Sequence, residues 1–459
     1  MKKTVVINVV GLTEGLLGKH TPFLSSFLKN GAKANIRPVL PGVTCSAQST
    51  YLTGLPPSGH GIVGNGWYFK DECEVKFWRQ SNKLVDVPKI WDKLKAEDER
   101  FSCANMFWWY NMYSSADFSV TPRPNYLADG RKIPDCYSHP PSLRDLLQKK
   151  LGTFPLFNFW GPKTSIRSSR WIADATILTD KLYDPTLSLV YLPHLDYNIQ
   201  RHGNNFDIIQ KDLREIDVEV EKLATYFEKK NANIIILSEY GITDVNHPIH
   251  LNRILRENDM IAIRKERGLE LLDAGASKAF AVADHQIAHV YVNDDTARDK
   301  VYGLLMQTKG IERVLEGENL KKAGLNHERS GDFIAVADAT SWFTYYFWND
   351  DSKAPDYARM VDIHKKPGYD PVEMFTDPKD KWVVPKIVWK LLKKKLGFRT
   401  VMNVIPLKAA LVKGSHGRLP ESELDWPVII SNQPKSLEKD NIQAIEVFSI
   451  LEQHIKLKT

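Results

Sequence analysis

Cysteine is scarce in this chain of 459 residues. The four cysteines, Cys45, Cys73, Cys103 and Cys136, are widely spaced, and none follows Cys136 in the rest of the sequence. No Cys-x-x-Cys pair occurs, so a disulfide framework or a cysteine-based zinc finger is not expected. We predict four reduced thiols.

Long apolar runs are also missing. No segment approaches the ~20 consecutive apolar residues that a membrane-spanning helix needs. Lys2-Lys3 and the apolar residues after them resemble a short signal peptide, but Asn8 interrupts the run, Gly11 follows, and no small-x-small cleavage site is near. We therefore interpret Thr4–Val10 as a β-strand, and the compartment we expect is the cytoplasm.

A strong excess of one charge is absent as well. The 62 basic and 56 acidic residues give a net charge of +6, and we expect no nucleic-acid partner because binding to phosphates usually needs a basic stripe. One basic cluster stands out, in residues 385–399, where lysines alternate with Trp389 and leucines at helical spacing. Such an amphipathic helix suits peripheral contact with an anionic membrane, although a solvated helix face is the more ordinary role and the one we favour.

The remaining composition is that of a folded globular protein, with 43% hydrophobic and 26% charged residues. Three short β-branched or apolar runs, Thr4–Val10, Leu187–Leu192 and Asn233–Leu237, alternate with helical patterns, which predicts an α/β fold with a mostly parallel sheet. Polar clusters follow each run. Because ligands bind outside the carboxyl ends of parallel strands, we expect these clusters to converge on one site.

Two further regions differ in character. Residues 67–162 are rich in tryptophan, tyrosine and phenylalanine, which either line a pocket for a ring-bearing or apolar substrate or fill gaps in the core. Residues 260–340 alternate strand and helix patterns and predict a small α/β subdomain. The last amphipathic helix is expected over about 441–457, and the ionisable turn at 362–371 is a candidate site loop.

The most informative segment is 41–65. Thr44 follows a Pro-Gly turn and stands near the start of a predicted helix, where a hydroxyl activated by a base or a metal serves as a nucleophile and the helix N-terminus attracts an anion. Thr44 taken alone is equally suited to capping the helix.

The segment contains Thr44, then Thr53-Gly54, then Pro-x-x-His-Gly-Ile-x-x-Asn at 57–65. This order resembles the nucleophile segment of the type I phosphodiesterase and nucleotide pyrophosphatase branch of the alkaline phosphatase superfamily. The resemblance extends to a strand ending in Gly11-Leu12 before this segment, and to strands ending at Asp196 and in 238–241 and the block 414–417 after it, all in the family's order. The resemblance implies an alkaline-phosphatase-like α/β/α sandwich. It also implies a single catalytic domain over 1–459, in which the aromatic region and the small subdomain are inserts.

The resemblance further implies a metal-dependent hydrolase of a small phosphate ester. Thr44 matches the nucleophile, and Asp196 and His416 match metal ligands. The metal would be zinc or manganese, as one or two ions that activate the nucleophile and stabilise the leaving oxygen.

Several positions depart from the family pattern. Val10 replaces an aspartate, Glu239-Tyr240 replaces an Asp-His pair, and Gln200 stands where a histidine is expected, with His202 two residues further on. Tyrosine is a poor substitute for imidazole. Three alternatives follow: one metal held by Asp196, His416 and either His202 or Glu239, ligands recruited from elsewhere, or a degenerate non-catalytic relative.

The candidates for recruitment to metal or acid–base duty are Asp284, His285 and His194, the last placed two residues before Asp196 on an extended chain. For substrate contacts we expect Gln48, Tyr240, Arg123 and Arg131, since guanidinium binds phosphate through two parallel hydrogen bonds. The function that we favour is phosphodiester hydrolysis. The alternatives are hydrolysis of a phosphomonoester, phosphonate or sulfate ester, and binding of a phosphorylated metabolite without catalysis.

Overall fold

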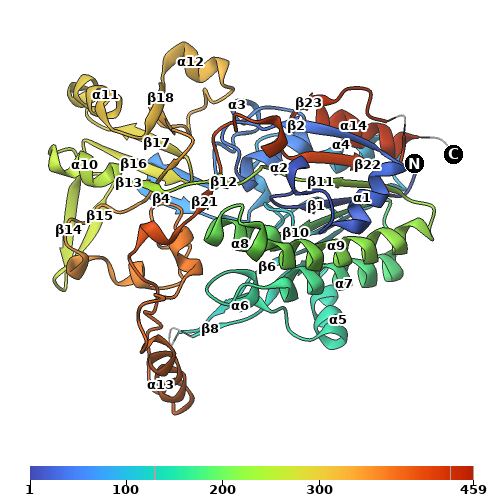
Figure 1. Ribbon diagram of the computed structural model, residues 1–459, viewed down its shortest axis with the longest axis horizontal. Coiled ribbons are helices and arrows are strands. Elements are labelled where there is room, and N and C mark those ends of the chain that lie inside the picture. Colours follow the sequence, from blue (N-terminus) through green and yellow to red (C-terminus); the bar gives the residue numbers. More distant parts are fainter. Residues whose placement is uncertain (129–130, 435, 458–459) are drawn as a thin grey trace.

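The computed structural model describes residues 1–128, 131–434 and 436–457, and its centre is a large mixed sheet (Figure 1). Among these residues nine strands form the sheet, in the order β23 (Asn441–Gln443), β2 (Ala32–Arg37), β22 (Val428–Ser431), β11 (Asn233–Leu237), β1 (Thr4–Val9), β10 (Leu187–Leu192), β5 (Cys103–Met106), β6 (Phe118–Pro122) and β9 (Cys136–His139). The five strands from β11 to β6 are parallel, whereas β22 and β9 run antiparallel to their neighbours. The predicted α/β fold with a mostly parallel sheet is confirmed.

The register of the central strands explains where their ends meet. Val9 lies opposite Leu192, and Asn8 lies opposite Leu237. All residues of β1, β10 and β11 are buried, as expected for parallel strands covered on both faces. The segments after these strands therefore emerge side by side at one edge of the sheet.

Helices cover both faces of the sheet (Figure 1). One layer consists of α1 (Pro22–Lys29), α5 (Pro141–Leu151), α6 (Leu156–Phe159), α7 (Ile166–Tyr183), α8 (His194–His202) and α9 (Phe206–Glu228). The opposite layer consists of α2 (Thr44–Thr53), α3 (Pro57–His60), α4 (Ile90–Glu97) and α14 (Glu446–Lys456). The arrangement is the α/β/α sandwich expected from the sequence.

A second, smaller lobe lies beside the sandwich (Figure 1). Its sheet has the order β16 (Ala279–Asp284), β17 (Ile287–Val292), β19 (Phe333–Ala337) and β18 (Ile311–Leu315), with α10 (Leu251–Glu257), α11 (Arg298–Gln307) and α12 (Gly317–Lys322) around it. Three short pairs complete the region: β3 (Gly66–Phe69) with β4 (Glu74–Phe77), β14 (Ala262–Glu266) with β15 (Leu269–Asp273), and β13 (His247–Ile249) with β20 (Ser341–Phe343). This lobe has its own apolar core.

Three boundaries differ from the sequence prediction. The region 67–162 is not a separate insert, because β5, β6 and β9 belong to the central sheet and much of its aromatic content fills the main core. The last helix begins at Glu446, since 441–443 form the edge strand β23. Asp196 lies in α8 rather than at the end of a strand, because Pro193 has no N–H to continue the ladder of β10 and turns the chain into a helix.

The helix predicted in the basic cluster is α13 (Val383–Lys395), which projects away from both lobes (Figure 1). None of its residues is buried. Within the part of the chain that the structure describes, no helix combines the length and the apolar character needed to cross a bilayer.

Candidate active site

The candidate site lies at the carboxyl ends of β1, β10 and β11, beside the first turn of α2. Thr44 is the first residue of α2, which follows extended backbone at Val43 and ends at Gly54 in the left-handed conformation. Glycine ends a helix in this way at little steric cost. Thr44 is 3% exposed, so the short helix holds its hydroxyl inside the protein.

A chain of hydrogen bonds runs from Thr44 across three elements. The Thr44 Oγ1 and Tyr240 Oη atoms are 3.3 Å apart, and Tyr240 Oη donates to Asp196 Oδ1 at 3.1 Å. The second Asp196 oxygen accepts from Gln200 Nε2 at 2.8 Å, one helical turn along α8. Tyr369 Oη in turn donates to Gln200 Oε1 at 3.1 Å. Tyr240 therefore connects the nucleophile candidate directly to a carboxylate.

Burial sets the protonation states of the residues in this hydrogen-bond chain. It raises the pKa of Asp196 to about 6, although the hydrogen bonds from Gln200 and Tyr240 act in the opposite direction. Burial likewise raises the pKa of Tyr240 well above its ordinary value. At neutral pH Asp196 is mostly ionised and is therefore able to accept a proton. Tyr240 is a neutral phenol that both donates and accepts hydrogen bonds.

Glu239 lies next to Tyr240 and is fully buried. Its Oε1 atom accepts hydrogen bonds from Asn8 Nδ2 and from Gln48 Nε2, and the side-chain oxygen Oε1 of Gln48 accepts from the Trp109 backbone N–H at 2.6 Å. Burial raises the pKa of Glu239 to about 8 despite these donors. Glu239 is consequently mostly protonated at neutral pH, and Gln48 positions it.

His416 and His285 meet above Tyr240. Their ring centroids are 3.6 Å apart, and Tyr369 stacks on the other side of His285 at 3.7 Å. His416 donates from Nδ1 to the Gly42 carbonyl at 2.7 Å, which leaves its buried Nε2 atom without a hydrogen-bond partner among the described residues. Burial lowers the pKa of His416 to about 3, so the imidazole is neutral.

Asp284 supports the nucleophile helix from the smaller lobe. Its two oxygens accept from the Asn65 backbone N–H at 2.8 Å and from the Asn65 side chain at 3.0 Å. Asn65 Oδ1 in turn accepts from the Cys45 N–H at 3.1 Å, directly beside Thr44. Burial raises the pKa of Asp284 to about 7. The turn between β16 and β17 thus brings both Asp284 and His285 to the site.

The other predicted residues lie elsewhere. His202 is exposed at the end of α8, six residues after Asp196 and on another face of the helix. Arg123 and Arg131 are both exposed and flank the hairpin of β7 (Asn125–Tyr126) and β8 (Lys132–Ile133). None of the three takes part in the hydrogen bonds described above.

The side chains around Thr44 do not fit the two-metal centre that the resemblance implies. Both oxygens of Asp196 already accept hydrogen bonds, and the Tyr240 ring fills space against His416. Val10 offers no ligand atom. Among the described residues of this cluster, no three ligand atoms from histidine, cysteine, aspartate or glutamate lie within 4.8 Å of one another.

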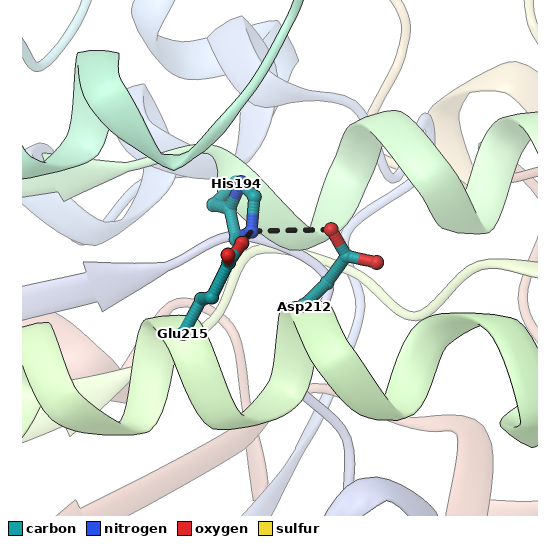
Figure 2. A group of neighbouring side chains, drawn as sticks. All are labelled: His194, Asp212 and Glu215. Carbon is teal, nitrogen blue, oxygen red and sulfur yellow. Dashed lines mark hydrogen bonds and ion pairs between the residues drawn. The ribbon is translucent and has the colours of Figure 1, made fainter.

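A group of three such ligand atoms does occur elsewhere, and it includes His194, two residues before Asp196. His194 Nε2 lies 3.2 Å from Asp212 Oδ1 and 3.2 Å from Glu215 Oε2, where α8 packs on α9 (Figure 2). The prediction that His194 and Asp196 share a side is wrong, because residues two apart point in different directions on a helix. The donor set of one imidazole and two carboxylates suits zinc or manganese, and the three ligand atoms lie within 4.8 Å of one another.

Sequence reasoning missed two supports of the site. Asn8 interrupts an apolar run in the sequence, and a polar residue in an otherwise apolar, fully buried strand is a signal that its side chain meets a polar partner. Tyr369 lies in the loop that the sequence singled out at 362–371, but its partners Gln200 and His285 are far away in the sequence. Only the fold brings these residues together.

Comparisons with known proteins identify the family and the fold. The family model for type I phosphodiesterase / nucleotide pyrophosphatase matches residues 4–370. A Schizosaccharomyces pombe protein named as an uncharacterized pyrophosphatase/phosphodiesterase is 26% identical over 268 residues, which are 56% of this chain and 47% of that protein. The chain thus spans about half the length of that relative.

Two solved structures share the fold. Mouse ectonucleotide pyrophosphatase/phosphodiesterase 5, an inactive form in complex with AMP, superposes with a TM-score of 0.60 at 14% identity, covering 100% of this chain and 96% of that one. Phosphonoacetate hydrolase from Sinorhizobium meliloti, in complex with phosphonoformate, gives 0.58 at 14% identity, covering 99% and 96%. Because the family model spans most of the sequence, the chain belongs to the type I phosphodiesterase/nucleotide pyrophosphatase family.

Proposed function

We propose that this chain hydrolyses a phosphodiester or a related phosphate ester of a small molecule, with Thr44 as the nucleophile. Membership of a family named for phosphodiesterases and pyrophosphatases supports the reaction class. The observation that carries the proposal is the hydrogen-bond chain from Thr44 through Tyr240 to Asp196.

In the proposed reaction, Thr44 Oγ1 attacks the phosphorus atom. The hydroxyl proton passes to Tyr240 Oη as the phenolic proton of Tyr240 passes to Asp196 Oδ1, and the bond from phosphorus to the leaving oxygen breaks with its electron pair on that oxygen. Water then attacks the phosphorus atom of the phosphothreonine and the bond from phosphorus to Thr44 Oγ1 breaks. Thr44 Oγ1 regains its proton from Asp196 through Tyr240, and a proton of the attacking water neutralises the alkoxide released in the first step. The N-terminus of α2 favours negative charge next to Thr44 throughout.

Backbone and side-chain contacts fix this geometry. Asn65 accepts a hydrogen bond from the Cys45 N–H and donates its own backbone N–H to Asp284. These bonds connect the first turn of α2 to the smaller lobe. His416 stacks on Tyr240 with ring centroids 3.5 Å apart and an interplanar angle of 6°, which restricts the phenol to one orientation. Pre-positioned groups of this kind lower the entropic cost of reaching the transition state.

The substrate class separates the proposal from its alternatives. Purified protein should turn over bis-p-nitrophenyl phosphate faster than p-nitrophenyl phosphate, a phosphonate ester or p-nitrophenyl sulfate. The likeness to phosphonoacetate hydrolase keeps a phosphonate among the probes. A Thr44→Ala variant with unchanged turnover would remove the nucleophile from the proposal.

A second candidate is a non-catalytic relative that binds a phosphorylated metabolite. Gln200 and Tyr240 favour it, because they fill family metal positions with groups that hydrogen-bond Asp196. AMP serves as a probe, since the mouse relative was solved with it. Calorimetric binding of AMP with no turnover of any ester would support this candidate over the hydrolase.

The cofactor in the proposal is a divalent cation, zinc or manganese, held by His194, Asp212 and Glu215 (Figure 2). It would tie α8 to α9 and so fix the helix that carries Asp196. No step of the reaction depends on it. We further propose the cytoplasm as the compartment, which the four unpaired cysteines support.

A further inference from the structure

The segment around α13 exposes an unusual amount of apolar surface. We define the α13 arm as residues 379–401. Nine of its large hydrophobic side chains are between 44% and 69% exposed, and they are Trp382, Val384, Val388, Trp389, Leu391, Leu392, Leu396, Phe398 and Val401. Single exposed apolar residues are normal, but a contiguous set of this kind marks an interaction surface.

The arm is amphipathic. Val384, Val388 and Leu391 follow one another at spacings of four and three residues, which places them on one side of the helix. Lys386, Lys390 and Lys393 have the same spacings and form the opposite side. No residue of α13 is buried, and the helix stands clear of the body in Figure 1.

The arm also holds the positive excess of the whole chain. Residues 379–399 contain eight basic residues and one acidic residue, Asp380, whereas the rest of the sequence has 54 basic and 55 acidic residues. A second copy of the chain is therefore a poor occupant of the apolar side, because pairing two arms would bring two strongly positive segments together. Charge complementarity favours an anionic partner.

We propose that the α13 arm binds the surface of an anionic lipid bilayer. The helix lies in the plane of the interface, with its apolar side among the acyl chains and its lysines at the lipid phosphates. Trp382 and Trp389 suit the boundary between headgroups and hydrocarbon. With 13 residues the helix is about 20 Å long, which suits lying on a bilayer and is too short to cross one.

A neighbouring hairpin extends the same surface. Arg399 Nη2 donates to the Ala128 carbonyl at 2.9 Å, so the end of the arm contacts the β7–β8 hairpin, which lies near α13 in Figure 1. Tyr126, Leu127 and Ile133 of this hairpin are 52%, 37% and 38% exposed. They add apolar side chains at the base of the arm. The body would thus approach the bilayer with the α13 arm and this hairpin first.

Vesicle sedimentation with the full chain tests the proposal. We expect the protein to pellet with vesicles of phosphatidylcholine and phosphatidylglycerol but not with phosphatidylcholine alone, and to dissociate as NaCl rises from about 0.1 M to about 1 M, because salt screens the lysines. A Trp389→Glu/Leu392→Glu double variant should lower the partition coefficient at least ~10-fold, since two charges replace apolar anchors.

The matched control places the same charges on exposed apolar residues elsewhere. Leu182→Glu/Val218→Glu changes side chains that are 45% and 57% exposed on α7 and α9, and it should bind vesicles like the unmodified protein. Circular dichroism verifies that both variants fold. This test does not depend on the proposed hydrolase, because its readout is sedimentation alone.

Four outcomes would overturn the proposal. They are no pelleting of the folded protein with anionic vesicles, equal pelleting with neutral vesicles, unchanged pelleting of the Trp389→Glu/Leu392→Glu variant, and an equal loss in the control variant. A dimer in solution that the arm variant abolishes, without vesicle binding, would assign the apolar side to a second copy instead.

Discussion

The ring of Tyr240 lies flat against the imidazole of His416, with ring centroids 3.5 Å apart and an interplanar angle of 6°. The family resemblance of the sequence implies metal-binding histidines at both positions. Here one of the two has become a phenol that stacks on the other and links Thr44 to Asp196. Residue 240 therefore takes part in hydrogen bonding here rather than in metal binding.

Tyr240→Phe should keep the stacking and remove the hydroxyl. Loss of a group that transfers a proton lowers kcat by about 10²- to 10⁴-fold, whereas KM should change little because Tyr240 is placed on the proton path. Steady-state kinetics on bis-p-nitrophenyl phosphate measures both constants. Tyr345→Phe, at another fully buried tyrosine, is the control and should leave kcat unchanged. Equal kcat for Tyr240→Phe and the unmodified protein would contradict the proton path.

The rate should increase with pH across the pKa of Asp196. Burial raises this pKa to about 6, and only the ionised carboxylate accepts the proton, so kcat should be low at pH 5 and level off above pH 7. Asp196→Asn should remove the fall in kcat at acidic pH and should also abolish most of the rate. An acidic limb near pH 4, the ordinary range of an aspartate, would show that Asp196 is not the acceptor.

Metal should be lost when the group between α8 and α9 is altered. We expect the purified protein to contain about one equivalent of zinc or manganese by mass spectrometry, and His194→Gln/Asp212→Asn to contain none, because two of three ligands are gone. The control, His202→Gln/Asp207→Asn, changes an exposed histidine and an exposed aspartate on the same two helices and should retain the metal. Metal retained by His194→Gln/Asp212→Asn would place the ion elsewhere.

Restoring the family residues should create metal binding next to Thr44. The variant carries Val10→Asp, Gln200→His, Glu239→Asp and Tyr240→His. We expect calorimetry to detect additional zinc sites in this variant, because the ligand types of the two-metal pattern would again surround Thr44. The same titration of the unmodified protein should show no zinc site next to Thr44. Equal zinc binding by both proteins would mean that backbone geometry, rather than residue identity, excludes the metals.

Lys366→Ala should strongly destabilise the loop that carries Tyr369. Lys366 is 1% exposed, and its ammonium lies 2.7 Å from both Asp370 and Glu373. Removing it leaves buried carboxylates without a counter-charge, which costs about 3–5 kcal/mol of unfolding free energy. Urea unfolding measures the loss. Lys365→Ala, whose side chain is 64% exposed, should change stability by less than about 0.5 kcal/mol.

The sequence predicted much of the sandwich because its signals are local. The apolar runs of β1, β10 and β11 are each continuous, and Thr44 follows a turn that precedes a helix. The aromatic region was harder to interpret, because its composition is the same whether its rings line a pocket or fill a core. Only the pairing of β5 with β10 shows that this region belongs to the central sheet.

The candidate site was predictable in part. Thr44, Asp196, Glu239 and His416 do gather near one edge of the sheet, as motif order indicated. The partners of these residues could not be foreseen, because hydrogen bonds such as that from Tyr369 to Gln200 join segments 169 residues apart. The sequence predicts an extended chain at His194, but a helix begins there after Pro193. The His194 side chain therefore points away from the side on which the extended chain would have placed it.

Tyr369 joins two sides of the buried site. It hydrogen-bonds Gln200 and stacks on His285, while Thr44 below is only 3% exposed. Because Thr44 is buried, a substrate reaches its hydroxyl only after the surrounding side chains move, so the open form is a minor state that must appear before binding. The observed rate of substrate capture should then reach a ceiling at high concentration, set by how often the site opens rather than by diffusion.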